Sequence, residues 1–165
     1  MFCAALPIAY FINIVPLAAG AQMRNIALQT NNEKINLDDF KKAAKRFNPY
    51  MEGWRADLVK NAIVVLRTGS YEYSQDELDY ILKECRANVA KNPDSAYNNM
   101  LLGILYGELG KIDEKYFDLA KASLDRALAL SPNRQHIYFA YGRLYGLLKD
   151  KENLIKIFIK AISLE

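Results

Sequence analysis

The chain has 165 residues, a formal net charge of +3 and a hydrophobic fraction of 52%. This length suits one domain that is large enough to bury a core. Basic and acidic residues are interspersed, so no basic stripe indicates a nucleic-acid partner. Cys3 and Cys85 form neither a disulfide framework nor a zinc-ligand spacing, and we interpret both as free thiols in apolar surroundings.

The N-terminal segment, residues 2–23, contains no charged side chain, and its length matches the thickness of a bilayer core. We therefore expect an apolar anchor helix over residues 1–24 that is inserted in a membrane. Two alternatives stay open: a cleaved signal peptide, because Ala19–Ala21 resembles a cleavage site, and a helix packed on the rest of the protein. Positive residues follow the segment and none precedes it, which favours a cytoplasmic location for the C-terminal part.

After Arg24, apolar residues recur at helical spacing between recognisable caps, and no segment alternates as a strand would. The sequence therefore predicts an all-α fold. Caps at Asn36, Ser74 and Asp150, with Glu77 completing a capping box after Ser74, indicate three helix starts. The expected helices begin after residue 36, span about 52–67, 74–91, 95–109, 114–130 and 133–148, and start again at 150.

Two blocks in the second half of the sequence are similar and lie 39 residues apart: LLGILYGELGK from Leu101 and AYGRLYGLLKD from Ala140. The following helices repeat at a distance of 34 residues, which aligns Leu124 with Phe158 and Ala127 with Ala161. Self-similarity with such a period indicates an array of helical repeats.

This pattern resembles the tetratricopeptide repeat, in which antiparallel helix pairs stack as a solenoid. The resemblance implies two repeats in residues 92–165 and divergent helical hairpins, as decayed repeats, in residues 25–91. Small residues would lie where helices cross, and large ones would fill the space between them. The residues that carry this packing role are Gly103, Tyr106, Ala120, Leu124, Ala127, Pro132, Gly142, Tyr145, Phe158 and Ala161. Asn99 departs from the pattern, because an aromatic residue is expected at that position.

The resemblance also implies a groove for a protein or peptide partner, lined by the first helix of each repeat. Mapped by repeat position, the groove residues are Tyr97, Met100, Ile104, His136, Phe139 and Arg143. The alternative is that the aromatic residues among them only pack on a neighbouring helix. The asparagine and lysine set that holds acidic chaperone tails in some members is missing, so that ligand is not predicted.

A more particular resemblance rests on YFINIVPLAAG, FKKAAKRFNPYMEGWRADLVKNAI, NPDSAYNNMLLGILY and AKASLDRALALSPNRQHIYFAYGRLY. Together these segments are similar to the last membrane span and repeat tail of bacterial O-antigen ligase- and polymerase-like proteins. The resemblance implies a bacterial-type inner membrane. The glycosyl-transfer chemistry of that family lies in its multi-span part, so no catalytic residue is carried over to this chain.

No motif of the sequence predicts catalysis, and we expect neither enzymatic activity nor a cofactor. His136 is the only histidine, and no cysteine or carboxylate cluster surrounds it. We therefore expect a membrane-tethered module that mediates protein–protein contacts. Two alternatives remain: a fragment of a membrane glycosyltransferase-type O-antigen ligase that lacks its catalytic part, and a secreted or periplasmic adaptor with a cleaved signal.

The last predicted helix is apolar around most of its circumference, whereas repeat arrays normally end in a polar capping helix. Its apolar residues are Leu154, Ile155, Ile157, Phe158, Ile159 and Ile162. A second chain, further repeats or a lipid surface would cover this face, and we expect self-association through it.

Overall fold

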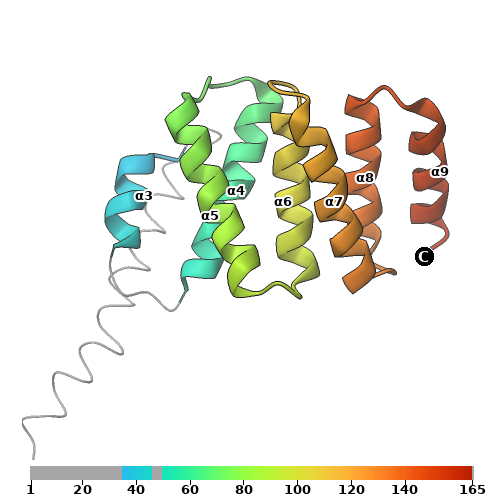
Figure 1. The fold of residues 1–165 in the computed structure, drawn as a ribbon, viewed down its shortest axis with the longest axis horizontal. Helices are drawn as coiled ribbons and strands as arrows, with labels where there is room; N and C mark the ends of the chain where they lie inside the picture. Colours follow the sequence, from blue (N-terminus) through green and yellow to red (C-terminus); the bar gives the residue numbers. More distant parts are fainter. Residues whose placement is uncertain (1–34, 46–49, 165) are drawn as a thin grey trace, which may run out of the picture.

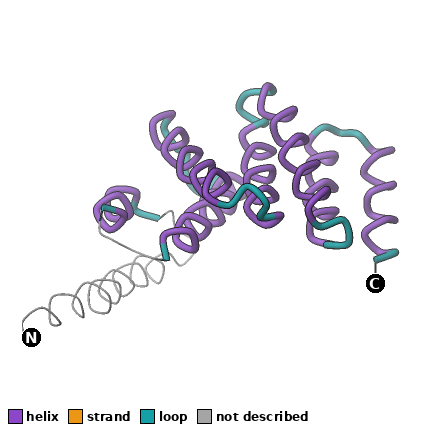
Figure 2. The backbone as a smooth tube through the Cα atoms, turned by 60° about the horizontal axis from the view of Figure 1, so that its bottom comes forward, coloured by secondary structure: helices purple, strands orange, loops and turns teal. Residues whose placement is uncertain are grey.

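The computed structural model describes residues 35–45 and 50–164. This part of the chain forms seven helices and no strand, as Figures 1 and 2 show, which confirms the all-α prediction there. The helices are α3 (Leu37–Ala44), α4 (Met51–Thr68), α5 (Gln75–Lys91), α6 (Ala96–Leu109), α7 (Lys115–Leu130), α8 (Gln135–Leu147) and α9 (Lys151–Ile162).

The expected membrane anchor, residues 2–23, lies outside the described residues, as does Cys3. Among the helices that the structure does describe, none combines the length and the apolar character that crossing a membrane requires.

Local capping chemistry sets the helix boundaries, and they follow the sequence predictions closely. The Asn36 side chain accepts hydrogen bonds from the backbone N–H groups of Asp38 and Asp39 at 3.0 and 3.3 Å. Ser74 and Glu77 form the predicted capping box at the start of α5. Gly69 ends α4 with a left-handed backbone (φ 65°), a conformation that glycine adopts at little steric cost.

Three antiparallel hairpins, α4–α5, α6–α7 and α8–α9, stack in a row (Figure 1). The first helices of the hairpins are neighbours, because α6 packs against both α4 and α8. In Figure 1, α5 and α7 lie in front of this layer. The short helix α3 packs at the start of the row, where Phe40 contacts the edge of the Tyr80 ring of α5 at 6.4 Å between centroids.

Two glycines allow the hairpin helices to approach closely, and they occupy equivalent places. A Cβ atom at Gly103 would lie 2.7 Å from Cγ of Leu124, and one at Gly142 would lie 2.8 Å from Cζ of Phe158. Leu124 and Phe158 are the pair that the sequence aligns at a distance of 34 residues. The cost of glycine inside a helix, about 1 kcal/mol relative to alanine, is therefore offset by close helix packing.

The other residues with an expected packing role lie in two environments. Tyr106, Ala120, Leu124, Ala127 and Ala161 are buried. Tyr145 is half-buried and stacks on the ring of Tyr141, with 5.9 Å between centroids. Pro132 is exposed in the turn before α8, and its carbonyl oxygen accepts a hydrogen bond of 2.6 Å from the Tyr138 hydroxyl.

Candidate partner-binding face

The predicted groove residues lie on α6 and α8, but the structure does not expose all of them. Tyr97 and Ile104 are half-buried, and His136, Phe139 and Arg143 are exposed. Met100 is a correction, because it is only 7% exposed and belongs to the core. The physical reason is that α6 is the central helix of the row and packs against α4, α5, α7 and α8.

The aromatic residues at the start of α8 also pack on a neighbouring helix. The Phe139 ring contacts Phe158 of α9 at 6.2 Å and His136 at 6.5 Å between centroids. Tyr97 of α6 lies under the guanidinium group of Arg134, which is 5.7 Å from the ring centroid. This half of the face therefore presents rings that are partly held by packing and partly open to a partner.

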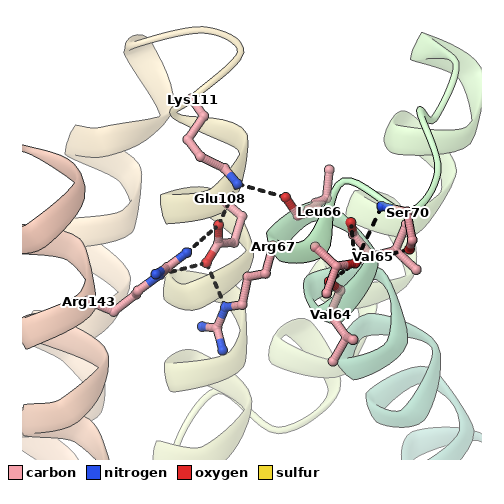
Figure 3. Close-up of polar contacts among 9 residues, drawn as sticks. Val64, Val65, Leu66, Arg67, Ser70, Glu108, Lys111 and Arg143 are labelled. Carbon is pink, nitrogen blue, oxygen red and sulfur yellow. Dashed lines mark hydrogen bonds and ion pairs between the residues drawn. The ribbon is translucent and has the colours of Figure 1, made fainter. Parts of the chain in front are cut away.

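A buried carboxylate with three cationic partners forms the polar centre of the face (Figure 3). The Glu108 side chain is fully buried in the last turn of α6. Its Oε1 accepts hydrogen bonds from Nε of Arg67 at 2.7 Å and Nε of Arg143 at 3.1 Å. Its Oε2 lies 3.0 Å from Nζ of Lys111 and 3.4 Å from Nη2 of Arg143.

We call Glu108, Arg67, Lys111 and Arg143 the Glu108 cluster. Each cation comes from a different place: Arg67 from the last turn of α4, Lys111 from the turn after α6, and Arg143 from the middle of α8. Lys111 also donates to the backbone carbonyl oxygen of Leu66 at 2.7 Å. One carboxylate thereby connects the first helices of all three hairpins.

The cluster keeps Glu108 ionised. Burial by itself would raise the pKa of this carboxyl, but hydrogen bonds from Arg143, Arg67 and Lys111 outweigh that effect and lower the pKa below its ordinary value. The three cationic side chains are 36–45% exposed, whereas the carboxylate is inaccessible. The solvent-facing side of the cluster is therefore positively charged.

A cavity of about 450 Å³ lies beside the cluster, between the α4–α5 turn and the α6–α7 turn. It shares Glu108 and Lys111 with the cluster. Its other lining residues are largely apolar or aromatic, and they include Leu66, Tyr71, Tyr73, Leu78 and Ile112. A volume in this range suits one large side chain or a small ligand.

A second polar network joins the start of α4 to the end of α5 and the start of α6. The Glu52 carboxylate accepts hydrogen bonds from Asn92 at 2.6 Å and from Asn98 at 3.1 Å. Asn88 donates to the backbone carbonyl oxygen of Glu52 at 2.8 Å. The network holds helix ends together inside the fold, and no cationic side chain takes part in these contacts.

The chemistry of the described residues favours binding. No group of three or more His, Cys, Asp or Glu residues in residues 35–45 and 50–164 could hold a metal ion. Cys85 is buried, and its burial raises the pKa of the thiol to about 12, so the reactive thiolate is scarce near neutral pH.

Sequence reasoning found Arg143 on this face but missed the Glu108 cluster. Glu108 is 41 residues from Arg67 and 35 from Arg143, so no local motif contains the group. The one available signal was a charged residue inside the apolar stretch LLGILYGELG. A carboxylate in such a stretch indicates a buried cationic partner, because an unpaired buried charge is costly.

Comparisons of the sequence with family models, with curated proteins and with solved structures gave no match. Function is therefore inferred from the fold and from the geometry of this face.

Proposed function

We propose that this chain is a tetratricopeptide-like interaction module that binds a protein segment along the face formed by α4, α6 and α8. One observation carries the proposal. The first helices of three stacked hairpins lie side by side, and they present half-buried rings and exposed cations on one continuous face. Such arrays act by binding, because consecutive repeats offer a preformed surface at low ordering cost.

The helix pairs favour this reading over an unrelated helical bundle. Gly103 and Gly142 contact Leu124 and Phe158, which are related by the same repeat distance in the sequence. A bundle without repeats gives no reason for two helix crossings to use equivalent residues. The tetratricopeptide resemblance supplies that reason.

We further propose that residues 2–23 tether the module to a bacterial-type inner membrane, as in the repeat tails of O-antigen ligase- and polymerase-like proteins. The apolar composition of this segment supports the tether. Membrane fractionation with N-terminal sequencing separates the tether from a cleaved signal, and recovery of the upstream reading frame tests whether the chain continues a glycosyltransferase-type protein.

The outer face of α9 supports a second contact, with another copy of the chain. Ile155, Ile159 and Ile162 are 59%, 63% and 66% exposed on this helix. In the preceding hairpin, the residue equivalent to Ile159 is Asp125, which accepts a hydrogen bond from Tyr141 of α8. The exposed isoleucines therefore stand where a hairpin normally meets its neighbour.

A selection of displayed random peptides on the full chain tests the interaction function. Val64, an exposed residue of α4, lies one helical turn before Arg67 on the same face. We expect Val64→Asp to weaken the binding of selected peptides. The matched control is Ala122→Asp, at an exposed position on α7, and it should leave binding unchanged. Failure to enrich any peptide, or equal losses in the two variants, would refute the proposal.

A further inference from the structure

We propose that the three cations of the Glu108 cluster form a carboxylate-binding subsite, which receives an acidic residue of a partner segment. A large apolar side chain next to that acidic residue would enter the adjacent cavity. This inference rests on the proposed function, because it specifies the chemistry of the segment that the face binds.

The first argument is the surplus of positive charge. Three cations surround one carboxylate, so the cluster carries a formal charge of +2. Elsewhere in the described chain, Glu84 is also buried, and it has one cationic partner, Arg55, at 2.7 Å. One cation is therefore enough to accommodate a buried glutamate in this fold. The two additional cations on Glu108 exceed what its burial requires.

The second argument is the supply of hydrogen-bond donors. Two arginines and a lysine carry roughly thirteen N–H donors between them. The contacts to Glu108 and to the Leu66 carbonyl use a minority of these donors. The remaining donors belong to side chains that are more than a third exposed, so they can reach an incoming anion.

The third argument is preorganisation. Glu108 binds Nε of both arginines, which holds the two guanidinium groups close together before any ligand arrives. Binding therefore costs less side-chain entropy than it would with three free surface cations. A planar guanidinium offers paired donors that match the two oxygens of a carboxylate.

The cavity identifies the ligand as a peptide segment rather than a free anion. It begins at Lys111 and Glu108 and continues between apolar and aromatic residues such as Leu66, Tyr73 and Leu78. A free inorganic anion would leave this apolar volume unused. A segment in which a carboxylate adjoins a large apolar side chain fills both parts at once.

A nuclear magnetic resonance titration of the full chain tests the inference at the atoms concerned. The probe is a short peptide with blocked termini that carries a Glu-Phe pair between Gly and Ser residues. The matched peptide carries Gln-Phe. We expect the Glu peptide to shift the Nε–H signals of Arg67 and Arg143, and the Gln peptide to bind about tenfold more weakly. The Nε–H signals of Arg55 and Arg86 should not move, because their partners are Glu84 and the Tyr106 hydroxyl.

Variants complete the test. Arg143→Gln should lower the affinity for the Glu peptide about tenfold and remove the difference between the two peptides. Arg126→Gln, at an exposed position of α7 whose partner is Asp94, should change neither affinity. If Arg143→Gln proves unfolded in a thermal melt, the comparison of the two peptides on the unaltered chain decides the question.

The outcomes separate this inference from the proposed function. Peptides that bind the face with equal affinity in their Glu and Gln forms would overturn the carboxylate subsite and leave the interaction function standing. If no peptide from the selection binds the face, both fail. Inorganic phosphate that shifts the Arg67 and Arg143 signals as strongly as the Glu peptide would show a general anion site, and would overturn the assignment to an acidic segment.

Discussion

A methyl group at Gly103 would be forced into a space that Leu124 already fills. The added Cβ would lie 2.7 Å from Cγ and 2.9 Å from Cδ2 of Leu124, and 3.1 Å from the carbonyl oxygen of Ala120. Leu124 is fully buried, so it has no solvent space into which it can turn. We expect Gly103→Ala to cost about 1–3 kcal/mol from overpacking, partly offset by about 1 kcal/mol of helix propensity.

Gly107 provides the matched control in the same helix. A Cβ at Gly107 would meet its nearest neighbour, Cδ1 of Leu144, at 3.8 Å, which is an ordinary contact. Gly107→Ala therefore keeps the propensity gain without the overpacking penalty. The difference between the two variants isolates the penalty, and we expect Gly103→Ala to be less stable by about 1–3 kcal/mol.

Urea denaturation followed by circular dichroism measures both free energies of unfolding. A further variant pair tests the cause, because Leu124→Ala removes the side chain that Gly103 faces. Leu124→Ala alone should cost about 2–5 kcal/mol, and Gly103→Ala should become neutral or stabilising in that background. A Gly103→Ala variant as stable as Gly107→Ala would refute the assignment of Gly103 to a helix crossing.

Three further predictions concern the cluster, the thiol and the last helix. The pKa of Glu108 is lower in the folded chain than its ordinary value of 4.5, so its ionised form stabilises the fold above that pH. This contribution is lost as the pH falls through the lowered pKa, and acid titrations of stability should be flatter for Glu108→Gln; identical curves would contradict the ion pairs. Cys85 should resist thiol reagents at pH 8 until urea unfolds the chain, because its pKa is about 12, and rapid labelling of the native protein would contradict its burial. Ile159→Glu should abolish concentration-dependent self-association in sedimentation equilibrium, and a chain that is monomeric at high concentration without the substitution would contradict a contact through α9.

Helix boundaries could be predicted because their causes are local. Asn36, Ser74 and Asp150 each accept a hydrogen bond from a backbone N–H group two or three residues ahead, so a few letters of sequence contain the whole interaction. The glycine crossings were accessible for a different reason. The repeat distance placed Gly103 and Gly142 opposite equivalent residues without any knowledge of the coordinates.

The candidate site was less accessible because its geometry depends on the whole stack. Mapping by repeat position placed Met100 in the groove, but α6 has neighbours on nearly every side and buries it. Tyr50, which the sequence favoured as a core residue, is exposed just before α4. The Glu108 cluster needs Arg67, which lies in the divergent part of the chain where no repeat alignment reaches.

The central claim is that a partner lies on the face formed by α4, α6 and α8. Photo-crosslinking from an engineered reactive side chain tests it most directly, with a selected peptide as the ligand and the reactive group at position 64 on α4 or position 122 on α7. We predict crosslinks from position 64 and none from position 122. Crosslinks from position 122 alone would place the partner on the opposite layer and contradict the account.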